Sequence, residues 1–339
     1  MLHALMCPPM EARLTRMDTE LTRTLGIEIP LICGAMYPCS NPELIAAVSD
    51  AGGIGIIQPI SMIYVHDRPL REGIQYLRTL TDKPVGFNAL VEKSSKLYED
   101  RMKEWMDIAL EEDVRFFITA LGNPRWVVEK VHAVGGIVYH DVVNRKWAEK
   151  ALAEGVDGLI CVNSRAGGHA GAQTPQVLME ELEPLGVPLI CAGGVGEEAD
   201  FVSALDMGYA GVQMGTRFIA TEECRAHSDY KDAIVNAEED DIVLTDRISG
   251  VPVAVINTPY IEKTGTEAGW FMKRMLRHPK MKHYARMYYS LKSLWQLKKA
   301  SLQGMNYKDF FQAGRSVSGV KKVESARAVV ARFEEAGKA

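Results

Sequence analysis

The chain has 339 residues, of which 47% are hydrophobic, so it is long enough to bury one large core or two smaller ones. A formal net charge of -5 and a sequence pI near 6.0 give no general attraction to nucleic acid or to an anionic membrane, and we expect neither as a partner. No uninterrupted apolar stretch reaches the roughly 18 residues that a membrane span requires.

Six cysteines are scattered without a C-x-x-C pair, and the N-terminal residues lack the apolar core of a signal peptide. This pattern predicts a cytoplasmic protein with reduced thiols. Cys161 and Cys191 are predicted to be core residues, and Cys39 has no basic residue close in sequence that would activate it. The histidines show no metal-ligand spacing, so no metal is expected. Residues 1–20 are predicted to be a disordered extension, or Met17 the working initiator.

From residue 31 to residue 218, short apolar runs alternate with longer amphipathic segments. Runs that are apolar throughout, rather than at every second position, indicate parallel strands covered on both faces. Eight such runs predict eight strands, over residues 31–36, 53–58, 85–90, 115–121, 137–142, 158–163, 188–194 and 211–218.

The segments between these runs predict helices over 42–50, 125–133 and 175–182, after Asn41, Pro124 and Thr174. Glycines stand near the expected helix ends, where a left-handed residue terminates a helix: Gly52, Gly135, Gly155, Gly186 and Gly208. Eight βα units in fewer than 200 residues predict an α/β fold, a (β/α)8 TIM barrel over 21–225. A doubly wound open sheet is the alternative, but it does not require eight units.

After residue 218 the pattern changes, and 226–312 is predicted to be a helical, basic lid or insertion. Within this region we expect a helix over 221–237, a strand and loop over 241–257, and a helical stretch over 266–302. Between Glu262 and Lys299, ten Lys or Arg face two acids, which indicates either a solvated helix face or a docking surface for an acidic carrier protein or a phosphate-bearing substrate. Residues 313–339 are predicted to return to the barrel and end in a helix.

Three glycine-containing turns follow predicted strands. Residues 166–171, Ala-Gly-Gly-His-Ala-Gly, hold the imidazole of His169 on a backbone that a ligand can approach closely. Gly193-Gly194 and Gly215-Thr216 each offer backbone N–H groups suited to an anion such as a phosphate. All three lie at carboxyl ends of strands, where a TIM barrel carries its active site.

These turns belong to a longer series of motifs: Gly34-Ala35-Met36, Gly86-Phe87-Asn88, residues 166–171, Ala192-Gly193-Gly194 and Met214-Gly215-Thr216-Arg217-Phe218. In order and spacing the series resembles the nitronate monooxygenase family, formerly called 2-nitropropane dioxygenases. That family also includes FMN-dependent type II enoyl-acyl-carrier-protein reductases and NADH:quinone reductases. Arg165 stands where relatives commonly carry a glutamate.

The resemblance implies one non-covalently bound FMN at the top of the barrel and makes His169 the active-site histidine. It implies cofactor contacts from Ala35, Met36, Asn88, His140, Gly167, Gly168, Ala192, Gly193, Gly194, Gly215 and Thr216. The alternative for His169 is a structural residue that caps its loop. The alternative for His140 is a core histidine bonded to a neighbouring carbonyl.

The leading hypothesis is an FMN-dependent enzyme that oxidises alkyl nitronates with O2. The second is an NAD(P)H-dependent FMN reductase of an enoyl thioester or a quinone, and the third is a flavin-binding barrel without turnover. In each the partner is a small molecule, and a homodimer is compatible with all three.

Overall fold

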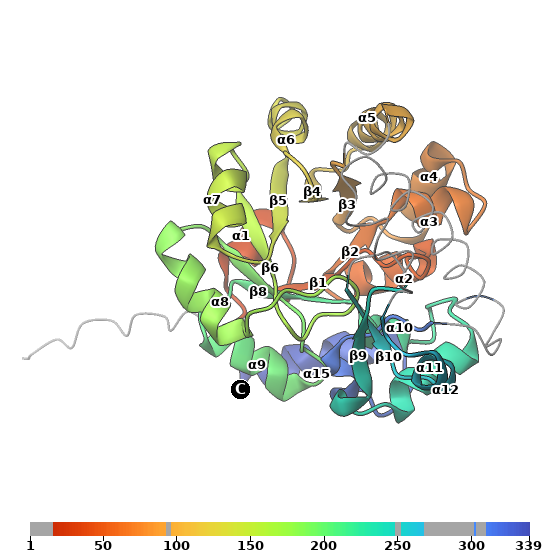
Figure 1. Cartoon of the computed structure of the whole chain (residues 1–339). Coiled ribbons are helices and arrows are strands. Elements are labelled where there is room, and N and C mark those ends of the chain that lie inside the picture. Colours follow the sequence, from red (N-terminus) through yellow and green to blue (C-terminus); the bar gives the residue numbers. More distant parts are fainter. Residues whose placement is uncertain (1–15, 93–95, 248–251, 268–301, 303–309) are drawn as a thin grey trace, which may run out of the picture.

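Eight parallel strands pair in sequence order, and the last returns to the first to close a barrel. The computed structural model describes residues 16–92, 96–247, 252–267, 302 and 310–339. The strands are β1 (Leu31–Cys33), β2 (Ile54–Ile57), β3 (Val85–Leu90), β4 (Phe116–Ala120), β5 (Ile137–Val142), β6 (Gly158–Val162), β7 (Leu189–Ala192) and β8 (Gly211–Met214). Each lies within one of the eight predicted runs, and helices surround the closed sheet (Figure 1), which confirms the (β/α)8 fold.

Helices follow each of the strands β1 to β7. They are α2 (Pro42–Asp50), α3 (Pro59–Tyr64), α4 (Leu70–Leu80), α5 (Lys96–Glu111), α6 (Arg125–His132), α7 (Arg145–Ala153), α8 (Pro175–Leu182) with the 3-10 turn η1 (Glu183–Leu185), and α9 (Glu198–Asp206). Thr174 caps α8 by accepting a hydrogen bond from the Val177 amide at 3.3 Å. Asn41 stands at the N-cap of α2 but makes no side-chain cap bond there. The five glycines predicted at helix ends all have positive φ, from 69° at Gly186 to 104° at Gly208.

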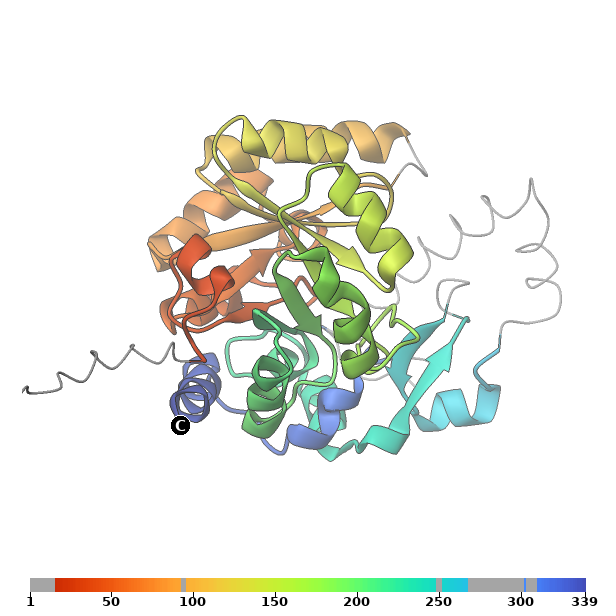
Figure 2. The ribbon, with the colours of Figure 1, turned by 90° about the vertical axis from the view of Figure 1, so that its left-hand side faces the viewer.

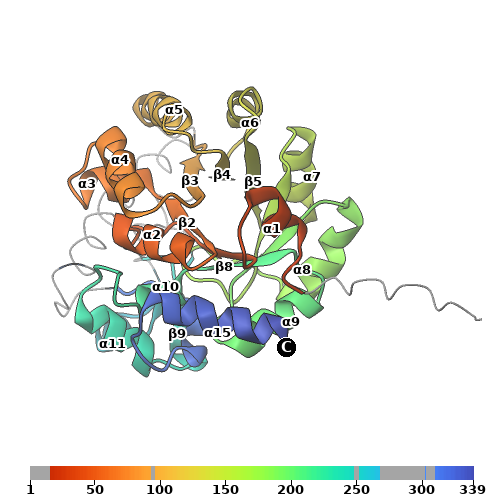
Figure 3. The ribbon, with the colours of Figure 1, turned by 180° about the vertical axis from the view of Figure 1, so that it is seen from behind.

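The barrel interior and the layer between barrel and helices are separate cores. Interior side chains include Ile54, Phe116 and Tyr139, while Phe87 and Phe117 belong to the outer core. Cys161 and Cys191 are buried in the outer core, as predicted. At the amino-terminal end, α1 (Glu20–Leu25) lies across the barrel (Figure 3) and inserts Leu21 into the interior cluster. The carboxyl ends of the strands therefore form the end that α1 leaves uncovered.

A long insertion leaves the barrel after β8. Its described elements are α10 (Thr216–Ile219), α11 (Ser228–Asn236), the 3-10 turn η2 (Glu239–Asp241), β9 (Ile242–Thr245), β10 (Val253–Ile256), α12 (Pro259–Thr264) and η3 (Arg315–Gly319). Figure 2 shows the β9–β10 pair (cyan) at the end of the barrel opposite α1 (red). The region 226–312, predicted as helical, thus contains an antiparallel ladder, and the predicted helix over 221–237 begins only at Ser228. Most of the basic stretch over 266–302 lies outside the described residues.

The chain returns from the insertion through α15 (Ala326–Lys338), which packs against α9 and α2. These two helices follow β7 and β1, so α15 fills the place of the eighth barrel helix (Figure 3). Residues 216–325 are therefore an insertion between the last strand and the last helix of the barrel. No helix in the described ranges is both long enough and apolar enough to cross a membrane.

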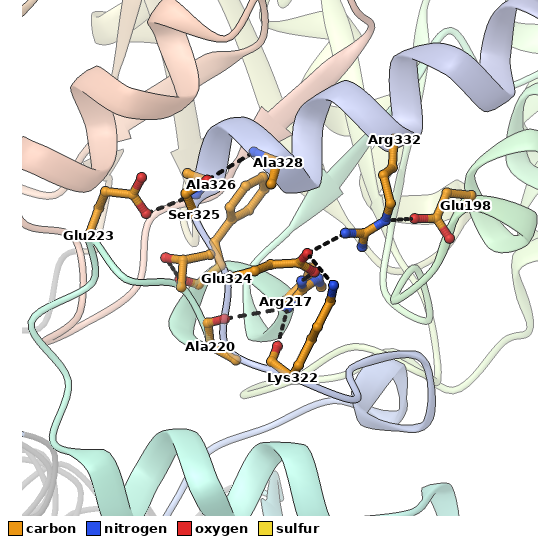
Figure 4. A network of polar contacts seen from close by, with 12 residues as sticks. Glu198, Arg217, Ala220, Glu223, Lys322, Glu324, Ser325, Ala326, Ala328 and Arg332 are labelled. Atoms are coloured by element: carbon orange, nitrogen blue, oxygen red, sulfur yellow. Dashed lines mark hydrogen bonds and ion pairs between the residues drawn. The ribbon is translucent and has the colours of Figure 1, made fainter.

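A buried ion-pair network fixes α15 at this position (Figure 4). Arg217, 1% exposed, pairs with Glu324, and Arg332 of α15 links Glu324 to Glu198 of α9. Burial alone would raise the pKa of Glu324, but the bond from Arg332 and the charges of both arginines hold it below its ordinary value. The Ala326 amide, at the start of α15, also donates to Glu223 Oε2 at 2.8 Å.

Replacing Arg217 with Met should lower the free energy of unfolding by about 3–5 kcal/mol, because it removes one partner of a buried pair and leaves the Glu324 charge undercompensated. Urea denaturation followed by circular dichroism measures this loss. As the matched control, Arg125→Met removes an exposed pair with Glu129 and should not measurably change stability. Equal stabilities of the two variants would contradict a structural role for the network.

Candidate active site

The loops after β6 and β7 are tied together by a buried asparagine. Asn163 accepts a hydrogen bond from the Arg165 amide at 2.8 Å and donates to the Gly193 carbonyl at 2.9 Å. Its own carbonyl accepts from the amides of Ala166 and Gly171. One side chain therefore sets the path of the loop that carries His169 and of the neighbouring glycine turn. From the sequence, Asn163 was predicted only as part of a strand.

Backbones pack directly on one another where these loops meet the returning chain. A Cβ on Gly193, whose φ is 120°, would lie 2.5 Å from the Ala166 nitrogen. A Cβ on Gly167 would lie 2.8 Å from the Gly314 nitrogen, and one on Gly314 would lie 2.5 Å from the Gly167 nitrogen. Real Cβ atoms do not approach other atoms so closely, so these positions need glycine because of crowding within the protein itself.

The turns after β7 and β8 present unused donors. In the described part of the chain, the backbone N–H groups of Gly193, Gly194, Gly215 and Thr216 donate to no protein acceptor. The Thr216 hydroxyl accepts from the Gly314 amide at 3.0 Å, which leaves its own proton available to a ligand. Four such amides and a hydroxyl at the carboxyl ends of the neighbouring strands β7 and β8 are donors of the kind that bind a phosphate group.

Two arginines stand beside this group of donors, which we call the anion cradle (the amides of Gly193, Gly194, Gly215 and Thr216 with the Thr216 hydroxyl). The Arg165 side chain lies against Gly194, where a Cβ would be 2.5 Å from Arg165 Nε. Arg165 and Arg315 both pair with one oxygen of Glu239, at 2.9 and 3.1 Å. One carboxylate faces two guanidinium groups, so the net charge of this trio is positive and favours an anion nearby.

His169 lies on the rim, on a loop that the insertion holds. The carbonyl of Gly168, whose φ is 68°, accepts a hydrogen bond from the Ala254 amide of β10 at 2.8 Å. His169 is exposed at the surface, yet loss of water around its ring lowers its pKa, while the negative charge of Glu92 acts in the opposite direction. The neutral imidazole, which can accept a proton, therefore predominates at neutral pH.

Polar side chains occupy inward positions near the carboxyl ends of three barrel strands. Asn88 pairs in register with Ile118, Asp141 with Ile160, and Gln213 with Ile32, and these isoleucines all belong to the interior cluster. Paired residues on neighbouring strands face the same side of a sheet, so all three polar side chains point inward. Asp141 and Gln213 each have a buried oxygen with no hydrogen-bond partner within the described residues.

Of the remaining predicted site residues, some lie at this mouth and His140 points away from it. Ala35 and Ala192 pack on the interior cluster, and Met36 lies against the β8 turn, 3.5 Å from a Cβ built on Gly215. His140 faces the other way, since it alternates with Tyr139 and pairs with Thr119, whose hydroxyl is 2.8 Å from His140 Nδ1. Burial lowers the pKa of His140 to about 4. The bond to Thr119 gives this histidine a partner in the strand next to its own.

Asp141 and Gln213 were missed by the sequence analysis although a signal for them exists. Each is the polar residue at an inward position near the end of an otherwise apolar strand. No group of three or more His, Cys, Asp or Glu suited to a metal ion occurs among the residues that the structure describes.

The chain matches the nitronate monooxygenase family model over residues 18–334 and belongs to that family of oxidoreductases. It is 30% identical over 249 residues to a (3aS,4S,5R,7aS)-5-hydroxy-7a-methyl-1-oxo-octahydro-1H-indene-4-carboxyl-CoA dehydrogenase of Rhodococcus jostii, covering 73% of this chain and 68% of that protein. It is 28% identical to a probable nitronate monooxygenase of Staphylococcus saprophyticus, covering 73% and 81%. FabK from Thermotoga maritima has a similar structure, with a TM-score of 0.77, 29% identity and coverage of 95% and 96%.

Replacing Gly193 with Ala should destabilise the protein by more than the roughly 1–2 kcal/mol that a left-handed backbone costs a non-glycine residue, because the new methyl group also collides with Ala166 and Asn163. Gly186→Ala is the control: its φ is 69°, and a Cβ there meets nothing within 4 Å. Chemical denaturation of both variants measures the difference. A Gly193 variant that loses no more stability than the Gly186 variant would show that the loop yields without cost.

Proposed function

We propose that this protein is an FMN-dependent nitronate monooxygenase that oxidises alkyl nitronates with O2. The observation that carries the proposal is the anion cradle at the ends of β7 and β8, which shares a barrel mouth with the neutral imidazole of His169, in a chain of this family. A phosphate needs several fixed donors, and a nitronate is an anion whose oxygens need donors or cations nearby.

The residues at the mouth fit FMN. Gly193, Gly194, Gly215 and Thr216 would hold the phosphate through their amides and the hydroxyl, with Arg165 adding a positive charge beside Gly194. Unpaired Gln213 Oε1 and the amide of Asn88 face inward, where they would meet polar edges of a flavin ring. Ala35 and Met36 would provide apolar contacts beside the flavin ring. The bound flavin would supply the electron-transfer chemistry with O2.

His169 would act on the substrate in two ways. With a neutral nitroalkane, the neutral imidazole accepts the proton from the carbon next to the nitro group. With a nitronate that is already an anion, no proton has to be removed, so His169 serves only to position the substrate. Because the pKa of His169 is lowered, the proton-accepting form persists below the ordinary histidine range and is lost only as pH falls through the lowered pKa.

Changing His169 to Asn should slow oxidation of neutral nitroethane by roughly 10²–10⁴-fold and slow oxidation of preformed ethylnitronate much less, because only the first substrate needs a base. Oxygen consumption with each substrate measures the rates, and the flavin absorbance confirms that the variant is loaded. The control is His132→Asn, which changes an exposed histidine at the end of α6 that pairs with Asp157. This variant should leave both rates unchanged. Undiminished nitroethane oxidation by the His169 variant would exclude the proton-accepting role.

A second candidate is an NAD(P)H-dependent flavin reductase of an enoyl thioester. It is favoured by the likeness to FabK over almost the whole chain and by the relative named as a dehydrogenase of a carboxyl-CoA compound. The positive charge of Arg165 and Arg315 near the mouth also suits the phosphates of a thioester carrier or of a nicotinamide dinucleotide. Both candidates use the same cradle and histidine, so they differ in the electron donor.

Anaerobic mixing of the flavin-loaded protein with ethylnitronate, NADH or NADPH distinguishes them. Under the leading proposal, ethylnitronate bleaches the flavin absorbance rapidly and the nicotinamides do not. Rapid bleaching by NADH or NADPH with none by ethylnitronate would establish the reductase instead. A protein that stays colourless after incubation with FMN would refute both candidates.

A further inference from the structure

Asp141 faces the inside of the barrel at the carboxyl end of β5. Along this strand Val138 and Val142 belong to the outer core, and Tyr139 belongs to the interior cluster. Successive side chains of a strand point to opposite faces, so Asp141 points to the same side as Tyr139. It pairs in register with Ile160, which is also an interior residue. The carboxyl group therefore stands one layer above Tyr139, at the mouth.

The surroundings of this carboxyl group favour its neutral form. Oδ1 of Asp141 is buried and has no hydrogen-bond partner within the described residues. Burial raises the pKa of Asp141 from its ordinary 3.8 to about 7. A carboxylic acid keeps one O–H donor that a carboxylate lacks.

Among the described residues, the titratable side chains of the elements next to Asp141 are divided between the two faces of the sheet. On the adjacent strands, Cys161 of β6 and Thr119 of β4 lie on the outer face, as does His140 of β5 itself. Helices α6 and α7, which cover that outer face, carry the nearby charged side chains Lys130, His132, Arg145, Lys146, Glu149 and Lys150. Inside the barrel the titratable Tyr139 lies below, and His169 and Glu92 lie on the rim.

The inward side chains near Asp141 differ in polarity from those deeper in the barrel. Inward positions nearer the amino ends of the strands hold Ile54 and Phe116, whereas inward positions nearer the carboxyl ends include the polar Asn88, Asp141 and Gln213 and the small Ala192. Gln213 Oε1 is also buried without a partner in the described chain. Buried polar atoms are normally satisfied, so two unsatisfied oxygens at inward positions near the carboxyl ends of β5 and β8 indicate that a bound molecule supplies their partners.

We propose that Asp141 is an active-site proton donor, a carboxylic acid that hydrogen-bonds an acceptor atom of the anionic substrate bound at the barrel mouth. The inference rests on the proposed function in placing the reaction at this mouth. A neutral acid donates to a nitronate oxygen, whereas an ionised Asp141 repels it. Binding of an anionic substrate is therefore favoured below the pKa of Asp141 and weakens as pH rises through it.

The kinetic test compares the native enzyme with Asp141→Asn, which keeps the shape but cannot ionise. For ethylnitronate, kcat/KM of the native enzyme should fall about tenfold per pH unit above neutrality, and this decline should be absent in the variant. Glu92→Gln is the matched control, because it removes the acidic group whose charge acts on His169, and it should retain the decline. An unchanged alkaline decline in a folded, flavin-loaded Asp141→Asn enzyme would overturn the proposal.

Two measurements without turnover separate this proposal from the proposed function. The infrared spectrum of the native protein should contain a protonated-carboxyl band that disappears between about pH 5 and pH 9 and is missing in Asp141→Asn and in Asp141→Ser. Because the folded pKa is raised, stability contributed by this group is lost as pH rises from about 4 to about 7. The melting temperature of the native protein should therefore fall relative to that of Asp141→Asn as pH rises across this range. Absence of both effects would refute the proposal even in a protein that oxidises nitronates normally.

Discussion

The buried pair between Arg217 and Glu324 joins the two ends of a long excursion of the chain. The two residues are 107 positions apart in the sequence. Between them lies the insertion that begins after β8 and ends before α15. Burying a charge without a partner is unfavourable, so the buried Arg217 favours the fold in which the chain before α15 returns to the barrel and supplies Glu324. Arg217 directly follows Thr216 of the anion cradle, and Glu324 lies two residues before the first residue of α15, with the N-cap Ser325 between them. The pair that closes the ring of barrel helices therefore also sets the position of the cradle.

The chain that returns to α15 also contacts the loops at the mouth of the barrel. On its way to α15 the chain places Gly314 against Gly167 and bonds its amide to the Thr216 hydroxyl. On its way out, β10 bonds to Gly168, next to His169. The glycine loop is thus held between the insertion and the barrel, with Asn163 below it. Glycine is needed here chiefly because three segments of backbone meet with no room for side chains.

Loss of water also sets the protonation of the two titratable groups at the mouth. Loss of water lowers the pKa of His169 and raises that of Asp141, so desolvation drives both groups toward their neutral forms. A neutral imidazole accepts a proton and a neutral carboxylic acid donates one. Under the proposed function, two residues that would both be charged in water at mildly acidic pH would have complementary roles beside an anionic substrate. The backbone amides of the cradle carry no titratable charge and stay donors at every pH.

The sequence by itself determined the barrel, because a parallel strand covered on both faces has a continuous apolar run that can be recognised locally. It also determined the helix ends at Gly52 and Gly186, the positions of the glycine turns, and the family to which the chain belongs. Those features depend on residues within a few positions of one another, so local order is enough to predict them.

Only the tertiary structure decided that α15 is the eighth barrel helix, because that assignment depends on packing against α9 and α2, far away in the sequence. Only the tertiary structure decided which way His140 and Asp141 point, because continuous apolar runs conceal the alternation of strand faces. His140 was predicted to contact the cofactor and its neighbour was not, yet Asp141 is the one that faces the mouth. Inward and outward have no meaning until the sheet has closed.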